Sequence, residues 1–175
     1  MSYLMRAVYN RTNWDRAQFP DWVAIDDLPS SIVSDLQADN NALSLWEIQD
    51  GEFNLSEVIV AIASRQPGSK AYFDYALLKT DLVDDISFHL SRADGDTPYL
   101  DANPYHRILS NLSMHKLVYF AHLLCKRGEF RRAPWKKVRK SILNTHRDGK
   151  LDVSRMRKGL KLELKIDEPK STGQL

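Results

Sequence analysis

The chain of 175 residues has little of what would cross-link it or anchor it in a membrane. Cys125 is its only cysteine, which excludes an internal disulfide and predicts a reducing compartment. Near the start, Arg6 interrupts the apolar run that a signal peptide would need. The longest uncharged apolar run, 117–125, has nine residues, against the roughly 20 of a membrane-spanning helix. We therefore expect a cytoplasmic protein without a membrane partner.

Sequence signatures of common enzymes are also missing. The chain has no glycine-rich nucleotide loop, no nucleophile elbow and no cysteine–histidine metal pattern. His115 and His122 lie seven residues apart in one helical segment, about 10.5 Å along the axis, which is too far to chelate one metal ion. We expect no metal and no cofactor, and we favour a protein without catalytic activity.

The composition is that of a globular protein, with 27% charged and 43% hydrophobic residues, and the length suits one domain. Hydrophobic periodicity and turn residues predict an α+β fold. Strands are expected at 3–9, 42–48, 86–90 and 160–166. Helices are expected at 26–37, 54–65, 71–85, 109–128 and 134–149.

Charge divides this single compact domain into two parts. Residues 1–125 hold nine lysines and arginines against 17 acidic residues, whereas residues 126–165 hold 15 against four. We therefore predict a mixed, acidic N-terminal part over 1–105 and a basic, helical C-terminal part over 106–168 that closes with a strand. Residues 169–175 are expected to form a frayed tail.

Acidic residues are absent between Arg131 and Arg147, a stretch with seven lysines and arginines. In the helix predicted there, Trp135, Val138 and Ile142 share the buried side and the cations lie outside. Like charges one turn apart repel, so this surface predicts an anion against it. The candidate nucleic-acid-binding residues are Arg127, Arg131, Arg132, Lys136, Lys137, Arg139, Lys140, Arg147, Arg155, Arg157 and Lys158.

The expected partner is RNA or DNA, bound with a salt dependence of slope near −5 if about six phosphates are engaged. Two other partners fit the same charges. The first is an acidic surface of another protein, in a complex or a homodimer. The second is the acidic part of the same chain.

A small nuclease is the alternative from another class. Arg139 and His146 form an R-x6-H pattern that resembles the short motif of HEPN ribonucleases, which would imply attack by the RNA 2′-OH. Asp152, Glu163 and Lys165 are similar to the carboxylate–carboxylate–lysine arrangement of metal-dependent nucleases. The loop acids Asp94, Asp96 and Asp101 would supply the same carboxylates.

Residues 112–124, LSMHKLVYFAHLL, resemble the signature helix of the Panacea domain, which occurs in bacterial antitoxins and phage-linked proteins. The matching positions are Lys116, Leu117, Tyr119, Phe120, Ala121 and His122. Downstream, only Trp135 represents the tryptophan and Gly-Pro segment of that family. The resemblance implies an antitoxin or inhibitor that acts by protein binding in bacteria or phage.

Overall fold

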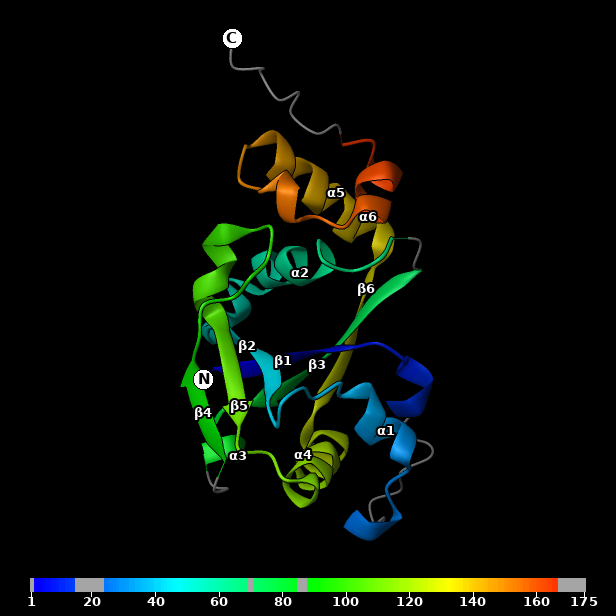
Figure 1. The fold of residues 1–175 in the computed structure, drawn as a ribbon, viewed down its shortest axis with the longest axis vertical. Coiled ribbons are helices and arrows are strands. Elements are labelled where there is room, and N and C mark those ends of the chain that lie inside the picture. The colour runs from blue at the N-terminus through cyan, green and yellow to red at the C-terminus, as the bar shows by residue number, and fades with distance from the viewer. Residues whose placement is uncertain (1, 15–23, 69–70, 85–87, 167–175) are drawn as a thin grey trace.

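The structure, a computed structural model, describes residues 2–14, 24–68, 71–84 and 88–166. They form one α+β domain around an antiparallel sheet with the strand order β4-β5-β2-β1-β3-β6 (Figure 1), which confirms the predicted class. The strands are β1 Tyr3–Val8, β2 Leu43–Ile48, β3 Tyr72–Lys79, β4 His89–Arg92, β5 His106–Ser110 and β6 Glu129–Pro134. The α-helices are α1 Ser30–Asp35, α2 Leu55–Ala63, α3 Asp81–Asp84, α4 Met114–Arg127, α5 Trp135–Arg147 and α6 Lys158–Leu164. Shorter 3₁₀ helices are η1 Arg11–Trp14, η3 Ile25–Asp27, η4 Asp50–Glu52, η5 Leu100–Tyr105 and η6 Val153–Arg155.

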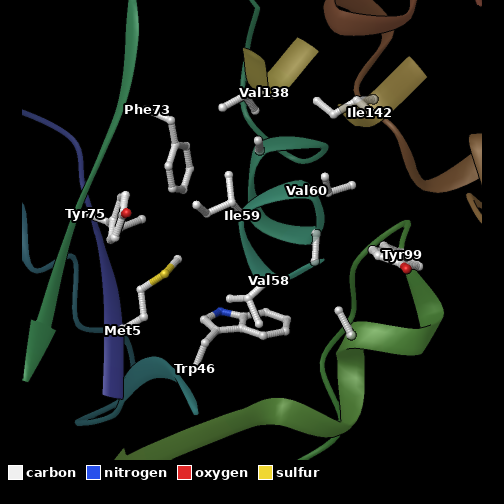
Figure 2. Packing of buried hydrophobic residues seen from close by; sticks show 14 of the residues in the cluster. Met5, Trp46, Val58, Ile59, Val60, Phe73, Tyr75, Tyr99, Val138 and Ile142 are labelled. Atoms are coloured by element: carbon white, nitrogen blue, oxygen red, sulfur yellow. The ribbon is translucent and has the colours of Figure 1, made fainter. Parts of the chain in front are cut away.

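Successive side chains of a strand point to opposite faces, so the sheet separates two hydrophobic cores. In β1, Leu4 and Val8 belong to one core and Met5 and Ala7 to the other. Helices α2, α5 and α6 cover the Met5 side, which we call the α5 layer, and α1, α3 and α4 cover the other side, the α4 layer (Figure 1). Figure 2 shows the α5 layer, where Val60 of α2 lies near Ile142 of α5. Within the described residues, no helix has the length and apolar character needed to cross a membrane.

Strand β3 corrects the helix predicted over 71–85. Phe73 and Leu77 pack in the α5 layer, whereas Ala76 and Leu78 pack in the α4 layer. A strand that is buried on both faces carries a continuous apolar run, which periodicity cannot distinguish from a buried helix. Only the short helix α3 follows it, and β4 overlaps the end of the strand predicted at 86–90, whose first residues lie outside the described ranges.

Helix α6 corrects the strand predicted over 160–166 and with it the closing strand of the basic part. Leucines at every second position also include a pair four residues apart, Leu160 and Leu164, and both of these are buried. Leu162 lies between them and its side chain is 71% exposed. The helical period explains this burial, because residues four apart share a face.

The basic part of the chain contributes two strands that the sequence does not predict. Strand β5 lies between β4 and β2, and β6 pairs with β3 at the opposite edge. The acidic and basic parts therefore share one sheet. The tail predicted at 169–175 lies outside the described residues.

Candidate functional site

Helix α5 forms where the sequence predicts it. Pro134 precedes the first turn, and Gly149, at φ +69°, follows the last, in keeping with proline at helix starts and glycine just after helix ends. Trp135, Val138 and Ile142 are buried in the core of the α5 layer, where Figure 2 labels Val138 and Ile142. The predicted inner side of the helix is confirmed.

Trp135 is a packing residue, as the apolar stripe predicts. Its side chain is only 6% exposed, and its indole Nε1 donates a hydrogen bond to Oε1 of Glu163 at 3.1 Å. The indole therefore has no face available for a nucleic-acid base. Together with Arg139, whose Nη2 donates to the main-chain oxygen of Glu163 at 2.9 Å, it fixes α6 against α5.

The outer side of α5 carries four exposed cations, which we call the α5 basic face: Lys136, Lys137, Lys140 and Arg147. None of the four forms an ion pair with a carboxylate in the described part of the chain. The remaining exposed position between them, Asn144, is uncharged and polar. The face is therefore cationic and free of apolar side chains.

The two arginines of β6 are paired within the chain. Arg131 donates two hydrogen bonds to the carboxylate of Glu52, at 2.7 and 2.8 Å, and a third to Glu129 at 2.8 Å. These bonds, with Glu129 contributing most, raise the pKa of Arg131 further above its usual value. Arg132 donates to Asp74 at 2.8 Å and lies over the Tyr72 ring. Both positive charges are compensated without a ligand.

Arg155 is also compensated by acids of the same chain. Its Nη1 lies 3.0 Å from Asp96, and its Nε lies 3.0 Å from Asp152. Asp96 pairs in addition with Arg65. The basic part thus folds back onto the acidic part at these places, as the intramolecular alternative predicts.

The last three candidates lie away from the α5 basic face or at its margin. Arg127 ends α4, so it belongs to the α4 layer, and β6 runs between it and α5 (Figure 1). Arg157 lines a cavity beside α2, and Lys158 is the exposed first residue of α6. The eleven predicted residues therefore do not form one continuous surface.

The carboxylates and lysine of the metal-dependent nuclease pattern are not arranged as predicted. Glu163 and Lys165 would share a face on a strand, but Glu163 lies in helix α6, and Lys165 follows the end of that helix in a left-handed conformation, at φ +55°. Asp152 accepts hydrogen bonds from the Ser154 main chain and hydroxyl, and the hydroxyl contributes most to lowering its pKa. In the ranges that the structure describes, no three histidine, cysteine or acidic side chains form a potential metal site.

Two of the three loop acids are paired, since Asp101 lies 3.9 Å from Lys150 and Asp96 is paired as above, whereas Asp94 lines a cavity beside α2. In the HEPN-like pattern, Arg139 and His146 both lie on α5 and are half-buried, and the Arg139 guanidinium holds α6. The Arg139 guanidinium is therefore already engaged with α6 and is not positioned with His146 for catalysis.

A cavity of about 440 Å³ opens beside the C-terminal end of α2, in the α5 layer. Trp46 of β2, His106 of β5 and Arg65 are among its lining residues, together with Arg157. Of these four residues, only Arg157 is predicted from the sequence, because the other three come from separate segments that only the fold brings together. The loop acids Asp94 and Asp96 also line the cavity. Burial lowers the pKa of His106; a hydrogen bond with the Ala93 main chain partly opposes this, and the neighbouring Arg107 charge lowers the pKa slightly further.

No protein-family model, curated protein or solved structure matches this chain. The helix that resembles the Panacea signature is α4, in which Leu117, Phe120 and Ala121 are buried in the core of the α4 layer. The resemblance stays a prediction.

Proposed function

We propose that the protein binds nucleic acid without catalysis, and that the α5 basic face is its contact surface. The observation that carries the proposal is the contrast within the basic part of the chain. Arg131, Arg132 and Arg155 find carboxylates on the folded protein. The α5 basic face has no such partner among the described residues and is exposed.

An external anion would relieve an unfavourable arrangement in the helix. Lys136 and Lys140 lie one turn apart, where like charges repel. Lys136 and Lys137 also lie in the first turn, where the partial positive charge of the helix N-terminus disfavours cations. Phosphates placed against these side chains would compensate both effects, and the counterions released from the nucleic acid would add to the binding free energy.

The shape of the face favours phosphates over a protein partner. From Lys136 to Arg147 the helix rises about 16 Å, a length over which one strand of a duplex presents about five phosphates. Protein interfaces usually have an apolar centre with a polar rim. The exposed positions of α5 between these two residues include no apolar side chain.

The expected salt dependence follows from the four exposed cations. Four phosphate contacts give a slope of log binding constant against log salt of about −3 to −4. This is shallower than the slope expected for six contacts, because Arg131, Arg132 and Arg155 are paired within the chain.

The test measures fluorescence anisotropy of labelled single-stranded RNA, single-stranded DNA and duplex DNA at low salt. We expect K136E/K140E to weaken binding at least tenfold. The matched control is K79E/R92E, which changes the net charge equally at exposed residues that end β3 and the edge strand β4. We expect this control to stay within twofold of the unmodified protein.

Two results would overturn the proposal. One is the absence of binding by the unmodified protein to all three nucleic acids at low salt. The other is an equal loss of affinity in K136E/K140E and K79E/R92E, which would mean that net charge, and not the α5 basic face, determines binding.

A further inference from the structure

The cavity beside α2 exists because no helix covers one end of the sheet. Along β2, side chains of the α5 layer change from fully buried at Ile48, through Trp46, to exposed at Ser44. Helix α2 ends at Ala63, before it reaches this end. The turn after α2 and the segment 94–97 close the sides, and the cavity of about 440 Å³ is in the size range of small-molecule sites.

Two rings on neighbouring strands form an aromatic wall. Trp46 and His106 are directly opposed in the β2–β5 ladder, and their ring centroids lie 5.1 Å apart at an interplanar angle of 57°. Tyr9, which follows β1, adds a third ring to the lining. Because burial lowers the pKa of His106, its ring is uncharged at neutral pH. Because the two rings are tilted by 57° and Trp46 is only 7% exposed, the half-buried His106 ring is the surface on which a planar ligand can lie.

Two guanidinium groups, from Arg65 and Arg157, and two carboxylates, from Asp94 and Asp96, line the cavity. Arg65 is held in place by Asp96, through the main-chain oxygen and a side-chain contact at 3.5 Å. Asp96 is shared with Arg155, which lies outside the lining. Arg157 is exposed and forms no ion pair with any carboxylate of the described segments. Guanidinium groups bind phosphate through paired hydrogen bonds.

We infer that this cavity binds a nucleotide, with the base against His106 and the phosphate at Arg157. Gln37 also lines the cavity, and its amide provides both donors and an acceptor for the edge of a base. The combination of an aromatic ring, an amide and a guanidinium group matches the chemical parts of a nucleotide. The inference goes beyond the proposed function, because the cavity shares no residue with the α5 basic face.

The test is calorimetric titration of the full chain with adenosine 5′-monophosphate, with adenosine and with inorganic phosphate. We expect the nucleotide to bind at least tenfold more tightly than either part. R157E should weaken nucleotide binding at least tenfold, whereas K158E should leave it within twofold. Arg157 and Lys158 are adjacent and exposed, but only Arg157 lines the cavity.

A second variant fills the cavity from a position that tolerates the change. Ser44 is an exposed strand residue that lines the cavity, and phenylalanine is favoured in strands. S44F should therefore fold and lose nucleotide binding. The inference is overturned if the nucleotide does not bind at millimolar concentration, if R157E and K158E behave alike, or if S44F binds normally.

Competition then identifies the source of the nucleotide. A 5′-phosphorylated trinucleotide that displaces the mononucleotide and depends on Arg157 supports the end of a strand as the occupant. A trinucleotide that does not compete supports a free nucleotide. K136E/K140E separates this inference from the proposed function, because that variant should lose the polymer and keep the mononucleotide.

Discussion

Arg131, Arg139 and Lys140 show how residues of similar charge differ in their surroundings. Arg131 meets the carboxylates of Glu52 and Glu129. Arg139 donates to a main-chain oxygen and braces α6. Lys140 is exposed and meets no described acid. The first two charges contribute to the fold, so only side chains like that of Lys140 are available to an external anion.

His106 carries a prediction about pH at the scale of a single residue. Its pKa is lowered in the folded protein by burial, so the unfolded chain binds more protons as the pH falls through the ordinary histidine range near 6.5. The free energy of unfolding should therefore fall as the solution is acidified from pH 7.5 to 5.5, by at most about 1.4 kcal/mol per pH unit from this group.

Urea denaturation at several pH values measures the effect. H106Q should show a shallower loss of stability on acidification than the unmodified protein. H115Q, at an exposed position of α4, is the matched control and should follow the unmodified protein. Equal slopes in all three proteins would show that the charged form of His106 is tolerated in the fold.

At the scale of elements, local signals are enough for α5 but not for β3 or α6. Pro134, Gly149 and the spacing of Trp135, Val138 and Ile142 act within a single segment, and all are found as expected. The period of β3 is hidden because the strand is buried on both faces. Residues 160–166 fit two periods, and only packing against α5 decides between them.

The part of the candidate site that lies on one helix can be predicted from the sequence, whereas contacts between distant segments cannot. The α5 basic face follows from the amphipathic pattern of one helix. The pairing of Arg131 with Glu52 joins positions 79 residues apart and depends on the order of the strands. The contact between Trp46 and His106 depends in the same way on the register of β2 and β5. Such pairs require the sheet topology, which a single sequence does not reveal.

Acidic substitutions on the α5 basic face should differ in their effect on stability, although all of them should weaken binding. K136E places an acid in the first turn, where the helix dipole favours it, whereas R147E places an acid in the last turn, where the dipole disfavours it. Both variants change an exposed cation of the α5 basic face by the same charge. K136E should be the more stable of the two by about 1 kcal/mol at low salt.

Thermal unfolding at low ionic strength measures this difference, and high salt should reduce it, because screening weakens interactions between exposed charges. Both variants should bind nucleic acid more weakly than the unmodified protein. If R147E proved the more stable variant, the dipole argument for the strain in α5 would fail.

At the scale of the whole molecule, the sheet brings the two oppositely charged parts of the chain together. Among the described residues, four arginines of the basic part pair with acids of the acidic part: Arg107 with Glu47, Arg131 with Glu52, Arg132 with Asp74, and Arg155 with Asp96. The lysines and the arginine of the α5 basic face have no such partner within the described ranges and lie on the outside of the α5 layer. The inner side of α5 packs with α2 in the core of that layer. The α5 layer thus carries both proposed sites, the α5 basic face and the cavity, with α2 between the sheet and α5.

Lysine footprinting by acetylation and mass spectrometry, with and without a saturating oligonucleotide at low salt, tests the central claim most directly. We predict that Lys136, Lys137 and Lys140 lose reactivity when the oligonucleotide is present, while Lys79 and Lys165, exposed on other elements, keep theirs. Unchanged reactivity of the three α5 lysines in the bound protein, or protection of Lys79 and Lys165 to the same degree, would contradict the account.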